Sequence, residues 1–257
     1  MSTFQAVFLG VIEGFSEYLP ISSTGHLILA AKILGIETSE FLKSFEISIQ
    51  LGAILAVLAL YWRKLLFDPD IIKKIVVAFI PTGFLGFLFY PVIKSFLLES
   101  IDVVLWSLFL GGIALILFEI MHHEKENAVR ELNTMSLKQA FFIGVAQSIS
   151  IIPGISRSAA TVVGGLFAGL DRKTIVEFSF LLAVPTMLAA TGFDLLQNAS
   201  SFSPENFQAL FIGFATSFFT AILVVKLFLH YIKKHTFIIF GAYRILLALS
   251  FWLFILN

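Results

Sequence analysis

The chain has 257 residues, of which 58% are hydrophobic and only 13% are charged. Soluble domains carry about a quarter charged residues, so this composition indicates an integral membrane protein and excludes an ordinary soluble domain. The 17 basic side chains balance the 17 acidic ones, which gives no reason to expect nucleic acid as a partner, and the lack of cysteine excludes disulfides, thiolate metal sites and cysteine nucleophiles.

The predicted elements are six full-length apolar runs and two interrupted ones. The first region, residues 3–35, is broken near its middle by a proline followed by hydroxyl residues, and it lacks the basic start of a cleavable signal. Runs at 45–61, 75–93 and 103–121 follow, and each is close to the roughly 20 residues that a spanning helix needs. Residues 139–170 are broken in the same way as the first region, and runs at 175–196, 207–229 and 236–256 complete the chain.

Basic side chains gather in alternate loops, namely residues 62–74, 122–138, 171–173 and 230–235 (Arg63, Lys64, Lys73, Lys74, Lys125, Arg130, Lys138, Arg172, Lys173, Lys233 and Lys234). Loops 36–44, 94–102 and 197–206 are poor in them. Short basic loops favour the cytoplasm. The six runs then alternate correctly only if 139–170 is a re-entrant hairpin from the cytoplasmic side, and 3–35 a hairpin from the outer face with both chain ends outside.

The two broken regions also resemble each other in sequence. At one common offset, Gly10-Val11-x-Glu13-x-x-Ser16 matches Gly144-Val145-x-Gln147-x-x-Ser150, and Ile21-Ser22-Ser23 matches Ile155-Ser156-Arg157. Inverted repeats with discontinuous helices build sites at the repeat interface. The predicted fold is therefore all-α: one integral membrane domain over residues 1–257, with about six transmembrane helices, two re-entrant broken-helix hairpins, and inverted repeats at roughly 1–121 and 136–257.

Two acidic residues, Glu13 and Glu17, mark the first hairpin. They are four residues apart, so they share one face of a helix, where two carboxylates repel unless a cation bridges them or one is protonated. Acids inside a membrane indicate a functional site, and paired carboxylates suit a hard divalent cation such as Mg²⁺ or Ca²⁺. The alternative is that both acids lie in an aqueous vestibule.

The stretch after Pro20 predicts the N-terminus of a second half-helix that ends at about Leu34. Free amide groups at such a terminus bind anions. Ser22 and Thr24 are candidate substrate contacts, although a helix cap explains Ser22 equally well. Ser23, which faces the acids, is a candidate nucleophile. His26 is a candidate acid, base or phosphate contact, with an ordinary hydrogen-bonded histidine as the alternative.

The second hairpin carries an arginine flanked by hydroxyl residues at the start of its own half-helix. This arrangement suits bidentate phosphate binding by Arg157, with Thr161 one turn further along. The alternatives for Arg157 are snorkelling to the membrane surface and an ion pair with Glu13 or Glu17. The predicted substrate contacts on this hairpin are Ser156, Arg157, Ser158 and Thr161.

Two long motifs resemble those of a known family. They are Glu13-Gly14-x-x-Glu17-x-x-Pro20-x-Ser22-Ser23-Thr24-Gly25-His26 and Pro153-Gly154-x-Ser156-Arg157-Ser158-x-x-Thr161, with Phe45-Glu46-x-x-Ile49-Gln50-Leu51-Gly52 between them. The chain is similar over nearly its whole length to the bacterial undecaprenyl-diphosphate phosphatases of the bacitracin-resistance type.

The resemblance implies a metal-dependent hydrolase of the plasma membrane. Its substrate would be undecaprenyl diphosphate, its product the monophosphate carrier lipid used in peptidoglycan synthesis, and its site would open to the extracytoplasmic face. The catalytic candidates are then Glu13, Glu17, Ser23, His26 and Arg157, with Glu13 and Glu17 as metal ligands. Expected partners are the prenyl diphosphate and membrane lipids, with no nucleic acid, and assembly with copies of itself is left open. The rival function is a polyprenyl-phosphate flippase, because transporters are also built from inverted repeats with broken helices. A purely structural membrane protein is the last alternative, since it would not need these buried ionic side chains.

Overall fold

The structure, a computed structural model, describes residues 1–37, 39–92, 100–124, 127–198 and 207–254. Within these ranges the chain is helical, and the only β contact is an isolated bridge between Val129 and Leu170. The helices are α1 Thr3–Ser16, α2 Ser23–Ile33, α3 Glu40–Phe67, α4 Pro69–Val92, α5 Ile101–Met121, α6 Leu137–Gln147, α7 Arg157–Phe167, α8 Arg172–Asn198, α9 Phe207–Tyr231 and α10 Ile238–Phe254, with short 3₁₀ turns η2 Leu132–Thr134 and η3 Ser148–Ile151. The all-α prediction is confirmed.

Five helices are long and apolar enough to cross a membrane: α3, α4, α5, α8 and α9. The sixth predicted run corresponds to α10, which has 17 residues and is shorter than the other five. Helix α3 is longer than the predicted run at 45–61, because Ser39 caps it through Leu42 N and its helix continues past a kink at Tyr61. The chain is therefore a multi-pass membrane protein.

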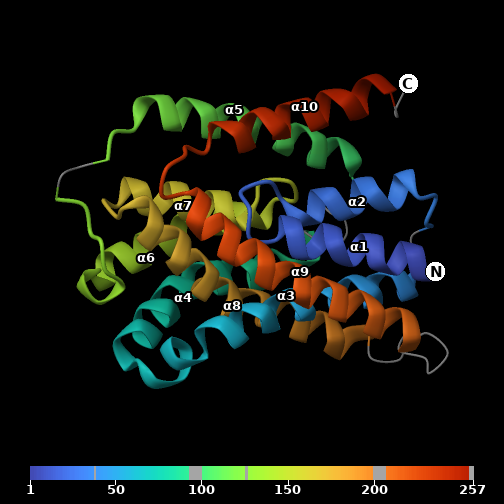
Figure 1. Ribbon diagram of the computed structural model, residues 1–257, viewed down its shortest axis with the longest axis horizontal. Helices are drawn as coiled ribbons and strands as arrows, with labels where there is room; N and C mark the ends of the chain where they lie inside the picture. The colour runs from blue at the N-terminus through green and yellow to red at the C-terminus, as the bar shows by residue number, and fades with distance from the viewer. Residues whose placement is uncertain (38, 93–99, 125–126, 199–206, 255–257) are drawn as a thin grey trace.

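The loops that are rich in basic residues lie together. In Figure 1 the connections α3–α4, α5–α6 and α9–α10 are all at the left end of the molecule, whereas α1 begins and α10 ends at the right. The bridge between Val129 and Leu170 brings the α7–α8 connection to the same left end. This arrangement agrees with the prediction that all the basic loops lie on the same side of the membrane. Lys125 and most of the poor loops 94–102 and 197–206 lie outside the described residues.

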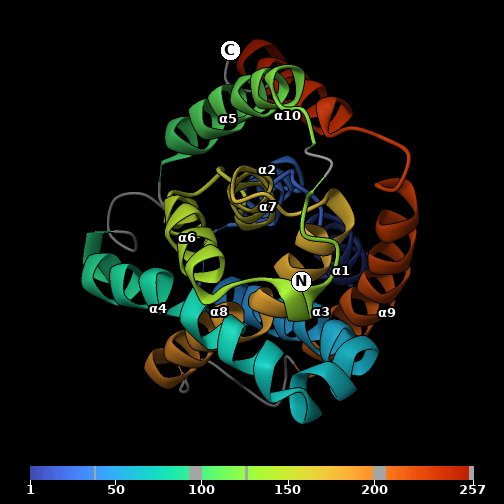
Figure 2. The same cartoon turned by 90° about the vertical axis from the view of Figure 1, so that its left-hand side faces the viewer.

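The two broken regions form the predicted hairpins. Helices α1 and α2 enter from the right end of Figure 1, and α6 and α7 enter from the left. In the view along the long axis, α2 and α7 lie at the centre, with the longer helices around them (Figure 2). Two short half-helices inside a ring of spanning helices are tolerated in a bilayer because other protein segments surround their irregular turns.

Small residues let the first arm of each hairpin pack closely against a spanning helix. A methyl group on Gly10 of α1 would lie 2.7 Å from the backbone oxygen of Gly213 on α9. A methyl group on Gly144 of α6 would lie 2.0 Å from the backbone oxygen of Ala78 on α4. Such backbone contact is typical of helix packing in membranes. The hydrophobic effect does not drive helices together there, and small residues allow the close approach that gives favourable van der Waals packing.

Candidate active site

Both half-helices begin in the same way. Ser22 caps α2 by accepting a hydrogen bond from Gly25 N, and Ser156 caps α7 by accepting one from Ala159 N. Their φ angles are 72° and 77°, and they are the only non-glycine residues with positive φ in the described part of the chain. This conformation is unfavourable for an L residue and recurs at functional sites. The predicted cap at Ser22 is present, and the second hairpin has a matching one.

The carboxylate of Glu17 joins the two hairpins. Ser23 Oγ donates a hydrogen bond to Glu17 Oε2 at 2.5 Å, and Arg157 Nη2 donates one to Glu17 Oε1 at 2.9 Å. All three side chains are buried or nearly so, since that of Arg157 is only 10% exposed. The ion pair considered as an alternative role for Arg157 is therefore present, with Glu17 as the acid. The burial of Arg157 gives no support to snorkelling at a membrane surface.

The guanidinium of Arg157 has further contacts around it. Its Nη1 donates to the backbone oxygen of Ser179 on α8 at 2.8 Å, and its Cζ lies 5.8 Å from the centre of the Tyr18 ring. Its Nε is buried and has no hydrogen-bond partner in the described part of the protein. The side chain is thus held in place while one donor stays free for an anionic ligand.

Glu13 lies fully buried one turn before Glu17 on α1. Both of its carboxylate oxygens lack a hydrogen-bond partner among the described residues. A buried carboxylate without partners is costly unless a proton or a cation neutralises it. The described residues contain no group of three His, Cys, Asp or Glu side chains that would hold a metal by themselves. A cation at Glu13 would take its remaining ligands from water or a substrate, as Mg²⁺ commonly does.

The predicted hydroxyl contacts of the second hairpin bind the protein itself. Thr161 is fully buried, and its Oγ1 lies 2.8 Å from Arg157 O and 3.2 Å from Gln147 Oε1. Ser158 donates to the backbone oxygen of Tyr18 at 3.0 Å. These hydroxyls support the turn that carries Arg157 and tie it to the first hairpin. Thr24 is half-buried.

His26 faces α10. Its Nδ1 lies 2.7 Å from the backbone oxygen of Ser22, and its Nε2 lies 2.7 Å from the hydroxyl of Tyr243. A carbonyl oxygen can only accept, so Nδ1 carries a proton and, in the neutral ring, Nε2 accepts from Tyr243. Both ring nitrogens are occupied by groups other than Ser23 and Glu17.

Four residues that bind predicted site residues or the hairpin turns were not predicted: Tyr243, Ser179, Gln147 and Arg244. Arg244 had a signal: it is a charged residue inside the apolar helix α10, and charged residues inside membrane segments are functional candidates by default. Ser179 and Tyr18 contribute through backbone oxygens, for which no sequence signal exists.

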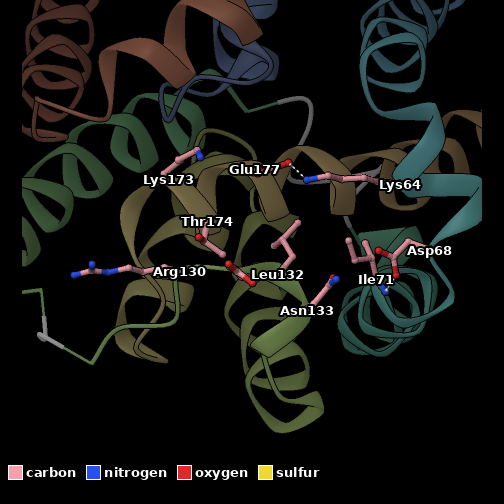
Figure 3. Close-up of a pocket in the computed structure, with 10 residues that line it drawn as sticks. Lys64, Asp68, Ile71, Arg130, Leu132, Asn133, Lys173, Thr174 and Glu177 are labelled. Atoms are coloured by element: carbon pink, nitrogen blue, oxygen red, sulfur yellow. Dashed lines mark hydrogen bonds and ion pairs between the residues drawn. The ribbon is translucent and has the colours of Figure 1, made fainter.

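Figure 3 shows a separate cavity of about 260 Å³, and no residue of the turns before α2 and α7 lines it. Its walls come from the α3–α4 and α5–α6 connections and the start of α8, and Lys64 Nζ donates to Glu177 Oε1 at 2.5 Å across it. The residues that line this cavity are Lys64, Asp68, Ile71, Arg130, Glu131, Leu132, Asn133, Lys173, Thr174 and Glu177. None of them is a predicted site residue. The candidate active site is therefore the cluster between the hairpins.

Comparisons with known proteins identify relatives of nearly the whole chain. The model of the family described as bacitracin resistance protein BacA matches residues 6–250. An undecaprenyl-diphosphatase from Aquifex aeolicus is 55% identical over 256 residues, covering 100% of both chains. Proteins of the same name from Persephonella marina and Wolinella succinogenes are each 49% identical, over 256 and 251 residues; the first covers 100% of both chains, and the second covers 98% of this chain and 97% of its own.

Proposed function

The chain belongs to the bacitracin resistance protein BacA family, and from that premise we propose that it hydrolyses undecaprenyl diphosphate to undecaprenyl phosphate and inorganic phosphate. The names of its relatives support this substrate. The flippase alternative is not favoured, because the relatives are named as phosphatases. A flippase would also need only charge complementarity to its lipid, whereas this site pairs a hydroxyl with a carboxylate.

The observation that carries the proposal is the contact of Glu17 with Ser23 and Arg157 at once. A carboxylate within 2.5 Å of a buried hydroxyl is placed to accept its proton. An arginine on the other oxygen of the same carboxylate, 2.9 Å away, is placed to meet the phosphate that the hydroxyl attacks. A nucleophile, its base and an anion clamp thus meet at one point.

The first step proposed is attack by Ser23. Its Oγ forms a bond to the terminal phosphorus while Glu17 takes the hydroxyl proton. The bond from that phosphorus to the bridging oxygen breaks, and undecaprenyl phosphate leaves with the electron pair. Water then attacks the phosphorus of the phosphoserine, and the bond to Ser23 Oγ breaks while Glu17 returns its proton to that oxygen. Inorganic phosphate leaves, and the attacking water gives up one proton to solvent. Direct attack by water is the alternative.

Arg157 and the starts of the half-helices would bind the substrate. Phosphoryl transfer depends mostly on positioning and on neutralising charge at the phosphate oxygens. The first N–H groups of α2 and α7 have no partner within their own helix, and the positive end of each helix dipole lies there. Because the guanidinium of Arg157 already contacts Glu17, binding of a phosphate would divide its donors between the two anions.

We further propose that Glu13 and Glu17 hold a divalent cation, Mg²⁺ or Ca²⁺. The two unpartnered, buried oxygens of Glu13 support a cation there. When bound, the cation would neutralise negative charge on the diphosphate. By the positive-inside rule the basic loops at the left of Figure 1 would face the cytoplasm, so the hairpin of α1 and α2 would open to the outer face of the plasma membrane.

The test is phosphate release from undecaprenyl diphosphate by detergent-purified protein, with and without EDTA. Wild type is expected to be active, EDTA to abolish turnover, and Glu17→Gln and Arg157→Ala to be inactive. Arg63→Gln, which changes an exposed arginine beside Trp62, is the control and keeps full activity.

Each part of the proposal has its own unfavourable result. Well-folded wild type that releases no phosphate at any metal concentration would return the flippase to first place. Release that EDTA leaves intact would remove the metal alone, and an active Glu17→Gln or Arg157→Ala variant would move the site away from the hairpins.

A further inference from the structure

A third element, α10, reaches the turns of both hairpins through Arg244. This side chain is fully buried, and no carboxylate pairs with it in the described part of the protein. Its guanidinium instead donates to four backbone oxygens: Nη1 to Ile155 at 3.0 Å and Pro20 at 3.4 Å, and Nη2 to Gly154 at 2.9 Å and Ser107 at 3.0 Å.

Three of these acceptors lie where the hairpin helices are broken. Pro20 lies in the turn before α2, and Gly154 and Ile155 lie in the turn before α7. Backbone oxygens in such turns have no helical donor, and a membrane interior offers no water to replace it. One planar guanidinium therefore serves the turns of two hairpins that enter the molecule from opposite ends.

The surrounding helices are shaped for this side chain. A methyl group on Gly111 of α5 would lie 2.1 Å from Arg244 Nη2, so only glycine leaves room for the guanidinium in its present place. The next residue of α5, Gly112, lies against Gly241 of α10. These two glycines let the helices approach closely, because a methyl group on either would lie 2.7 Å from the backbone oxygen of the other.

We propose that Arg244 is a positioning residue for the reaction. By binding both turns, it fixes the distance between Ser23, which starts α2, and Arg157, which starts α7. Glu17 can then contact both at once. No hydrogen bond joins Arg244 to Glu17, Ser23 or Arg157 in the described part of the protein: its Nη1 and Nη2 donate to backbone oxygens, and its Nε has no partner there. The inference depends on the proposed function only for its kinetic test.

Two variants disturb the clamp in different ways. Arg244→Gln removes the forked donor, whereas Gly111→Ala displaces the guanidinium and keeps its charge. Both are expected to lower kcat about a hundredfold, the effect of roughly 1 Å of misplacement, and to change KM far less than kcat. The matched controls are Arg63→Gln at an exposed arginine and Gly86→Ala, where a methyl group meets nothing within 4 Å; both keep wild-type kinetics.

A distance measurement separates positioning from general stability. The chain contains no cysteine, so spin labels can be attached to cysteines introduced at Ile33 and Phe167, the exposed last residues of α2 and α7. Pulsed electron resonance between the labels is expected to give a narrow distance distribution in wild type and both controls. In Arg244→Gln and Gly111→Ala the distribution is expected to broaden or shift.

Each outcome decides the inference. Wild-type distances in Gly111→Ala, or broadened distances with wild-type kcat, would overturn it, and if Arg244→Gln does not fold, Gly111→Ala decides alone. A merely structural role would lower the melting temperature but leave the distances and the kcat of the folded fraction unchanged. If wild type releases no phosphate, the proposed function fails, and the distances still test whether Arg244 holds the hairpins together.

Discussion

If Glu17 acts through Ser23, then removing both groups should cost no more than removing one. Glu17→Gln keeps the size of the side chain and leaves an acceptor for Arg157, but the amide cannot take a proton from the hydroxyl 2.5 Å away. A general base contributes roughly 10²–10⁴-fold, which is about 3–5 kcal/mol of activation free energy. Ser23→Ala removes the nucleophile and is expected to lose a similar factor.

The double variant gives the decisive comparison. Groups that act as one unit are strongly non-additive. If each single variant loses about a thousandfold in kcat, the double variant is expected to lose about a thousandfold as well. Independent roles would multiply the two losses to about a millionfold. The assay is kcat for phosphate release, with melting temperatures to show that each variant is folded. Ser23→Ala also leaves one buried oxygen of Glu17 unpartnered, so we expect a loss of about 1–3 kcal/mol of stability.

Two results would refute this reasoning. Multiplicative losses in the double variant would mean that Glu17 and Ser23 act in separate steps. More than a tenth of wild-type turnover in folded Ser23→Ala would mean that water attacks the phosphorus directly.

Three other predictions follow from single contacts. Glu13→Gln should abolish the rise in melting temperature that Mg²⁺ or Ca²⁺ gives EDTA-treated wild type, because a ligand that binds the native state stabilises it. Gly144→Ala should destabilise the protein by about 1–3 kcal/mol, since its methyl group would lie 2.0 Å from the backbone oxygen of Ala78. His26→Ala should lower kcat/KM less than tenfold and keep both limbs of the pH profile, because Ser22 and Tyr243 occupy the ring nitrogens.

One control variant and two contrary results test these predictions. Gly192→Ala, where a methyl group meets nothing within 4 Å, should leave the melting temperature unchanged. An undiminished metal-induced shift in Glu13→Gln would place the cation elsewhere. Loss of one limb of the pH profile in His26→Ala would make that imidazole a proton donor or acceptor in the reaction, contrary to its hydrogen bonds.

The hairpins and the helix cap at Ser22 could be predicted because they depend on short stretches of sequence. Proline followed by serine breaks a helix and caps the next one, so both hairpins and the cap at Ser22 follow from short stretches of sequence. Arg157 was predicted to contact a phosphate or to pair with an acid of the first hairpin, and Glu17 was one of the two acids considered. Which of the two acids it contacts depends on how the hairpins meet, and this is set by packing over the whole chain.

The parts that could not be predicted depend on backbone groups far away in sequence. Arg244 binds the oxygen of Pro20, 224 residues earlier, and Ser179 contributes its backbone oxygen to Arg157. Any residue type presents such an oxygen, so no pattern marks it. The protein partners of Thr161 could not be predicted either: its hydroxyl lies against Arg157 O and Gln147, and its predicted role as a substrate contact stays a prediction.

The packing of α1 against α9 constrains how the protein is made. The first hairpin is too short to cross the bilayer by itself, and the helix that receives Gly10 begins at Phe207, about 200 residues later in translation. At roughly 5–20 residues per second, α1 waits about 10–40 s for this partner to emerge. During that time α1 lacks the packing of α9, and Glu17 lacks its ion pair until Arg157 has been made, so we expect the hairpin to rest at the membrane surface and enter the bundle only near the end of synthesis. Helix α1 is then made before the other described helices but is among the last to reach its final place.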